Sequence, residues 1–167
     1  MTATDIIRRA LETGRDWAVG TSTDMLDAPL KFPTPKGGNH PVWVMAHLAV
    51  AEGSFSGMLT GNPSPAEKWN AAAGQGTEPT DNPDDYPLLQ EAIDLFVELR
   101  GKTLAYVATL TDADLDAPVP HAPEHLKKYD TFQSIGALLN VIALHSAVHI
   151  GQLCDARRAD GRKPQVA

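Results

Sequence analysis

The chain has 167 residues, 43% of them hydrophobic, and a formal net charge of -7 at pH 7. A chain of this length fits a single domain spanning residues 1–167, which would bury about 70% of the surface that the unfolded form exposes. The negative charge repels phosphate backbones and argues against a nucleic-acid partner. We find neither a signal peptide nor a continuous apolar run of about 18–20 residues, so we expect a cytoplasmic protein with no membrane partner.

The first predicted helix covers residues 4–27 and stops near Pro29. Thr2 and Asp5 have the spacing of a capping box at its start. Its apolar positions include Ile6, Ala10, Trp17, Ala18 and Met25. The second helix follows a Gly-Gly-Asn-His-Pro segment and runs from Pro41 to about residue 60, with Asn39 or His40 as its N-cap.

The third predicted helix begins after Asp84 and Asp85, with Pro87 in its first turn, and ends near Thr111. The fourth starts near residue 130 and continues to about Ala159. Four basic residues near its C-terminal end suit the negative end of the helix dipole: Arg157, Arg158, Arg162 and Lys163. The pattern of four helices without strands predicts an all-α bundle.

Two segments are longer than the loops of a minimal bundle, residues 61–86 and 111–130. Loops of this length in a compact domain are often lids or binding loops. An ordered connection with no direct function is the other interpretation.

Two histidines, His145 and His149, lie four residues apart in the fourth predicted helix. Such residues share one helix face, with Cβ atoms about 5–6 Å apart, and can bind one metal ion. Both interrupt the apolar stripe of the helix. His47 lies on the inward stripe of the second helix, four residues after Trp43. Three inward histidines can bind one ion and leave coordination positions open, as catalytic sites do.

Other polar residues are weaker candidates for this site. Gln152 follows His149 by three residues on the same face and could bond a metal-bound water or a substrate. His121 and His125 have the same spacing as the first pair, but prolines interrupt the segment, so a general acid or base role is their functional interpretation. Glu52 lies about 140° around the helix from His47, and Cys154 is displaced from the histidine face. A lone cysteine also agrees with a reducing compartment.

The chain resembles the DinB/YfiT-like superfamily of metal-dependent enzymes. The resemblance rests on Trp-Val-Met-Ala-His-Leu-Ala around His47 and on His-Ser-Ala-Val-His-Ile-Gly-Gln, which contains His145 and His149. It implies a four-helix bundle with a long crossover connection and a homodimer. It also implies a divalent ion, Zn or Ni, bound by His47, His145 and His149.

The resemblance implies an enzyme that transfers a low-molecular-weight thiol, as a cosubstrate, to a small-molecule substrate. A bound metal ion favours the reactive thiolate. Activation of water by the same ion would instead make the protein a hydrolase. A third hypothesis is a non-catalytic, metal-binding or stress-associated dimeric bundle. A DNA-associated role conflicts with the acidic charge.

Overall fold

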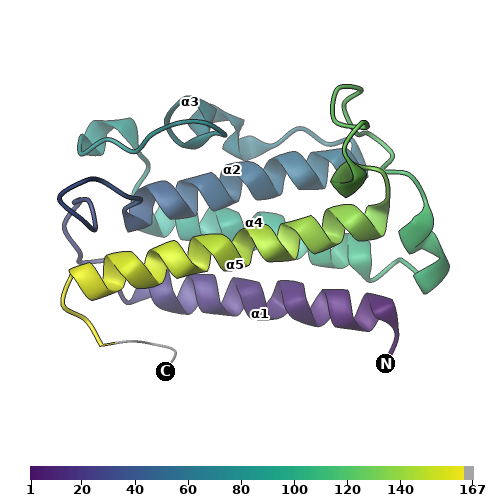
Figure 1. Cartoon of the computed structure of the whole chain (residues 1–167), viewed down its shortest axis with the longest axis horizontal. Helices are drawn as coiled ribbons and strands as arrows, with labels where there is room; N and C mark the ends of the chain where they lie inside the picture. The colour runs from purple at the N-terminus through teal and green to yellow at the C-terminus, as the bar shows by residue number, and fades with distance from the viewer. Residues whose placement is uncertain (164–167) are drawn as a thin grey trace.

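The computed structural model describes residues 1–163 and is helical, with no strand in this part of the chain. Four long helices form the bundle (Figure 1), and the short α3 lies in the connection between two of them. Their bounds are Ala3–Thr23 for α1, Pro41–Thr60 for α2, Asn70–Ala73 for α3, Leu89–Val107 for α4 and Ile135–Ala159 for α5. The predicted all-α bundle is therefore confirmed.

The four long helices run in two opposite directions. α1 and α5 run one way and α2 and α4 the other, as the colours of Figure 1 show. α2 packs against both α4 and α5, and α1 packs against the same two helices, so α1 and α2 occupy opposite corners. Because α2 and α4 are parallel, the chain between them must return along the whole bundle. Residues 61–88 are this long crossover.

Local capping explains where the first two long helices begin. Thr2 and Asp5 form the predicted capping box at the start of α1. His40 caps α2, because its Nδ1 atom accepts a hydrogen bond from the backbone N–H of Trp43. Gly61 ends α2 with a φ of 76°, a left-handed conformation that favours glycine.

Four predicted helix boundaries are wrong by several residues, among them the end of α4, which lies at Val107 and not near Thr111. α1 ends at Thr23 rather than at residue 27, and the next residues form turns. α4 spans Leu89–Val107, so Pro87 precedes the helix instead of entering its first turn. α5 begins after Ser134, whose hydroxyl accepts from the N–H of Ala137. Residues 130–132 form a separate 3-10 turn.

The buried face of α1 agrees only in part with the predicted stripe. Of the predicted positions, Ala18 and Met25 are buried, whereas Ile6 and Trp17 are exposed, and Leu11 is buried as well. Ser22 lies on the buried side as well, with its hydroxyl bonded to the carbonyl of Ala18. Small and polar residues on the buried side give a weak hydropathy signal, which left the exact position of this face open.

Two helices have the length and composition of a membrane span, although polar residues interrupt the apolar run in both. They are α2 and α5, and 67% and 39% of their most apolar windows are buried inside the bundle. A core helix of a bundle passes the same test. The burial of α2 is that of a core helix.

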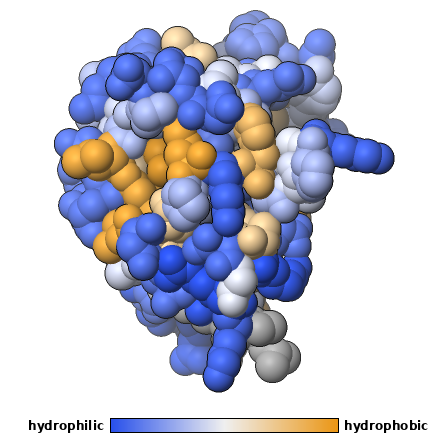
Figure 2. Space-filling model, turned by 90° about the vertical axis from the view of Figure 1, so that its left-hand side faces the viewer, coloured by the Kyte–Doolittle hydropathy of each residue, from blue (hydrophilic) through white to orange (hydrophobic). Residues whose placement is uncertain are grey.

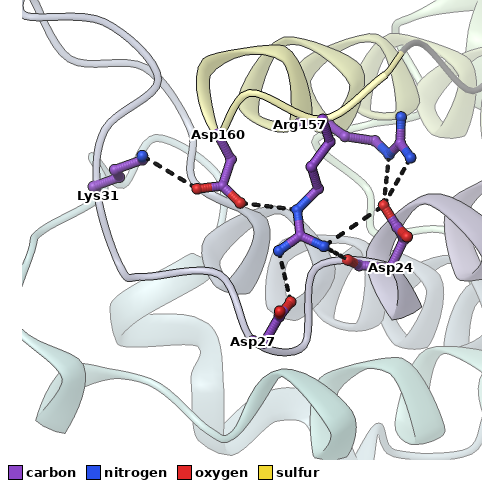
Figure 3. Close-up of polar contacts among 6 residues, drawn as sticks. Asp24, Asp27, Lys31, Arg157 and Asp160 are labelled. Atoms are coloured by element: carbon purple, nitrogen blue, oxygen red, sulfur yellow. Dashed lines mark hydrogen bonds and ion pairs between the residues drawn. The ribbon is translucent and has the colours of Figure 1, made fainter.

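Arg157, Arg158 and Arg162, three of the four basic residues near the end of α5, are paired with acidic groups; Figure 3 shows the contacts of Arg157. Arg157 contacts Asp24 at 2.7 Å, and Arg162 contacts Asp27 at 2.6 Å and Asp160 at 2.8 Å. These pairs join the end of α5 to the turn after α1. They also reduce the local positive charge that a nucleic-acid partner would need.

Apolar side chains gather on the end of the bundle seen in Figure 2. Leu26 is 45% exposed and Leu88 is 72% exposed. Both line a shallow pocket of about 190 Å³ between the turn after α1, the start of α2 and the start of α4. The pocket is mainly apolar and does not include the three histidines.

Candidate metal centre

Three histidines from two helices meet where α2 packs against α5. His47 lies in the second turn of α2, and His145 and His149 lie one turn apart on α5. The Nε2 atom of His145 is 3.2 Å from that of His47 and 3.2 Å from that of His149. The ligand atoms of all three lie within 4.8 Å of one another. The fold therefore brings the predicted triad together.

Two hydrogen bonds turn these rings towards a common centre. The Nδ1–H of His47 donates to the backbone carbonyl of Ala73 at 2.8 Å. The Nδ1–H of His149 donates to Oε1 of Gln152 at 2.7 Å. A neutral imidazole carries one proton, so both rings present an unprotonated Nε2 to the centre. Such outer hydrogen bonds are typical of metal-binding histidines.

The arrangement is unfavourable without a shared cation. The unprotonated Nε2 atoms of His47 and His149 both face Nε2 of His145. A single N–H on His145 can point at only one of them, so one pair of nitrogen lone pairs would remain opposed. Two nitrogens at about 2.0–2.1 Å from a tetrahedral ion are about 3.3 Å apart. The separation of 3.2 Å between His145 and each of the other two nitrogens fits a divalent ion at the centre.

The surroundings keep the imidazoles neutral. Burial, reinforced by the nearby His149, His47 and Arg100, lowers the pKa of His145 to about 3. Burial also lowers the pKa of His149 to about 4 and shifts the pKa of His47 downwards. Metal ligands must be deprotonated, and at neutral pH these three rings already are.

The crossover forms one wall of this centre. Ala73 belongs to α3 and supplies the carbonyl that His47 contacts. The Trp43 indole stacks on the His47 ring, with centroids 4.7 Å apart, and donates to the hydroxyl of Thr77. The Nε2–H of the fully buried His40 donates to the carbonyl of Thr80. Residues 73–80 are thus fixed to the first turns of α2, which favours an ordered wall over an open lid.

The sequence matches the family model of the DinB superfamily over residues 10–153. The chain belongs to the DinB superfamily. The matched region contains all four long helices in whole or in part and all three histidines of the cluster. Comparison with curated proteins finds no match.

This DinB-superfamily chain has a buried ion pair beside the centre that the sequence did not reveal. Arg100 on α4 donates from Nε and Nη2 to both carboxylate oxygens of Glu52, at 2.9 and 2.8 Å. Its Nη2 also donates to Ser146, the neighbour of His145, and its Nη1 donates to the carbonyl of Leu11. One guanidinium therefore links all four long helices. The position of Arg100 on the apolar stripe of α4 is the feature of the sequence that could have predicted a buried ion pair.

The other predicted candidates of this DinB-superfamily chain, Gln152, His121 and His125, lie at different distances from the three-histidine cluster. Gln152 contacts His149 directly. His121 is exposed and packs beside Gly61 at the far end of α2, about 20 Å along the axis from His47. His125 is exposed in the turns that follow. The structure brings neither His121 nor His125 to the cluster.

The two residues predicted to lie off the histidine face do so. Glu52 points into the core, where its carboxylate binds Arg100 and the hydroxyl of Thr103. Cys154 is a half-buried free thiol that packs against the core. Among the described residues, His47, His145 and His149 form the one cluster with metal-ligating spacing.

Proposed function

We propose that the protein is a divalent-metal-dependent enzyme with His47, His145 and His149 as its ligands. The convergence of three Nε2 atoms, two of them fixed by outer hydrogen bonds, carries the proposal. Membership of a metal-associated superfamily supports it. Three neutral imidazoles suit Zn or Ni and leave positions open for other ligands.

The reaction that we propose is transfer of a low-molecular-weight thiol to an electrophilic small molecule. An ion at this centre would lower the pKa of a coordinated thiol and supply a nucleophile at neutral pH. The sulfur forms a bond to the electrophilic carbon, the thiol proton is released, and the leaving group departs with the electrons of the broken bond. The neutral histidines leave the charge of the ion intact for this purpose.

A cleft beside the centre supports a small-molecule substrate. It has a volume of about 740 Å³ and lies between residues 33–39 and the last turns of α5. Gln152, the partner of His149, contributes to its lining. Lys36 adds a positive charge, whereas the charge of Arg158 is paired with that of Asp155, which also lines the cleft. We propose that this cleft holds the polar part of a substrate.

A thiol-dependent activity screen tests the proposed reaction. Metal-loaded protein should consume a low-molecular-weight thiol in the presence of a suitable electrophile, and His145→Ala should abolish the turnover. The matched substitution His125→Ala removes an exposed loop histidine, and we expect it to leave the metal content unchanged, whereas His145→Ala should lower the metal content as well as the turnover.

The screen also separates the alternatives. Hydrolysis of ester or amide substrates without added thiol would favour a metal-dependent hydrolase, in which the ion activates water. Metal uptake without turnover of any substrate in the panel would favour a non-catalytic metal-binding bundle. Either result would contradict thiol transfer while leaving the metal centre in place.

The homodimer implied by the resemblance stays a prediction. The exposed apolar sides of the first and third predicted helices, α1 and α4, are the places to look for its interface. Large exposed apolar side chains occur there, with Trp17 on α1 and Val97 on α4, but Leu144 and Val148 on α5 are more exposed. Sedimentation of the purified protein would show a dimer, and a monomer at micromolar concentration would contradict the prediction.

A further inference from the structure

Asn39 contacts the residue that orients His149. The Oε1 atom of Gln152 accepts two hydrogen bonds, one from the Nδ1–H of His149 at 2.7 Å and one from Nδ2 of Asn39 at 2.9 Å. A primary amide has one group that only accepts and one that only donates. The face that Gln152 turns towards His149 therefore depends on what Asn39 presents to it.

Gln152 and His149 have two self-consistent arrangements. With the oxygen of Gln152 towards His149, Nδ1 carries the proton and Nε2 is free to bind a metal ion. With the amide reversed, the nitrogen of Gln152 donates to Nδ1, and the proton of the neutral ring must move to Nε2. The second arrangement blocks coordination at Nε2. The hydrogen bond from Asn39 to Oε1 belongs to the first arrangement.

We propose that Asn39 is a positioning residue that selects the metal-binding tautomer of His149 by orienting Gln152. The consequence for metal affinity rests on the proposed function, because it needs an ion at Nε2. The selection of the tautomer does not, since it follows from hydrogen bonding within the protein. The two parts can therefore fail separately.

The fold holds Asn39 in place from both sides. The residues before it, Gly37 and Gly38, have φ of 106° and 108°, and a Cβ on Gly38 would lie 2.7 Å from Cγ of Pro33. The residue after it, His40, caps α2 and is bonded to Thr80. Asn39 therefore lies between a glycine turn and a fixed helix start.

The substitution Asn39→Asp tests the proposal because it replaces the donor with an acceptor. The new carboxylate should attract the nitrogen of Gln152 and turn its oxygen away from His149. In metal-free protein at neutral pH, ¹⁵N NMR of the histidine rings should show His149 protonated at Nδ1 in the wild type and at Nε2 in the variant.

Zinc affinity provides a second readout, measured by competition with a chelator. We expect Asn39→Asp to weaken Zn²⁺ binding about 10- to 100-fold, the usual range for loss of an outer hydrogen bond. Electrostatic attraction alone predicts the opposite change, a tighter binding of Zn²⁺, since an added negative charge attracts the cation. The exposed Asn140 on α5 offers a charge-matched control, and Asn140→Asp should bind Zn²⁺ at least as tightly as the wild type.

Two further variants keep the test decisive if Asn39→Asp does not fold. Gln152→Glu accepts from both partners and should retain the Nδ1–H tautomer. Asn39→Ala removes the donor alone and should show a mixture of tautomers with a smaller loss of affinity. An unchanged Nδ1–H tautomer in Asn39→Asp or Asn39→Ala would overturn the proposal. If the wild type takes up no zinc, the proposed function fails and the NMR comparison still decides the role of Asn39.

Discussion

At the scale of single residues, Arg100 has the most demanding environment in the bundle. Its side chain is 1% exposed, and that of Glu52 is 2% exposed. A buried ion pair stabilises little beyond the cost of removing both charges from water, but a single buried charge without its partner is strongly unfavourable. The bonds from Arg100 to Glu52 on α2 and Ser146 on α5 also connect the helices that carry the histidines.

Arg100→Met should therefore lower the free energy of unfolding by about 3–5 kcal/mol, because it leaves the Glu52 carboxylate buried without its cation. Urea unfolding measures the change. The double substitution Glu52→Leu with Arg100→Met should recover much of the loss, since no isolated charge remains. A single variant as stable as the wild type would contradict the buried pair.

The site residues that could be predicted from the sequence differ in kind from those that could not. His47, His145 and His149 are polar positions on apolar helix faces, and spacing alone places them inside. The hydrogen-bond partner of His47 is the backbone carbonyl of Ala73. Every residue has a backbone carbonyl, so the sequence gives no sign of which one accepts this bond. Asn39 is 113 residues from Gln152 in the chain, so their contact depends on the packed fold.

At the scale of elements, a short turn caps the first helix from a distant part of the chain. The Asp112 carboxylate accepts hydrogen bonds from the backbone N–H groups of Ala3 and Thr4 and from the Thr4 hydroxyl. These bonds lower the pKa of Asp112 below its ordinary value of 3.8. The start of α1 is thus tied to the segment that follows α4.

Asp112→Asn should lower Tm at pH 7, because the charged acceptor at the helix N-terminus is lost. The folded state lowers the pKa of Asp112, so the stabilisation is present above about pH 4 and disappears as pH falls through the lower folded value. Thermal unfolding at several pH values checks this. A difference in Tm that grows below pH 4 would contradict the assignment.

Helix existence was easier to predict than helix ends. Hydropathy located the four long helices, but it extended α4 to Thr111 and started α5 near residue 130. Capping decides these ends, and caps such as Ser134 depend on local backbone geometry. The buried face of α1 was predicted only in part, since Ala18 and Met25 are buried but Ile6 and Trp17 are exposed.

At the scale of the whole molecule, the three-histidine cluster joins α2 and α5 with the crossover. An ion that binds only the folded state stabilises it by mass action, by about 2.7 kcal/mol when the free ion is at 100 times its Kd. For a domain of this size, that corresponds to a rise in Tm of about 5–10 °C.

Adding Zn²⁺ to metal-free protein should produce this rise in Tm, and a chelator should reverse it. His149→Ala should remove the response, because the centre loses one of three ligands. His121→Ala is a matched control at the far end of α2 and should respond as the wild type does. An equal response in all three proteins would place the bound ion elsewhere.

The most direct test is the stoichiometry of metal binding, measured by calorimetric titration of metal-free protein with Zn²⁺ or Ni²⁺ and checked by elemental analysis. We expect one divalent ion per chain in the wild type and no tight binding in His145→Ala. Absence of an ion in protein purified without chelator, together with no uptake in the titration, would contradict the three-histidine centre.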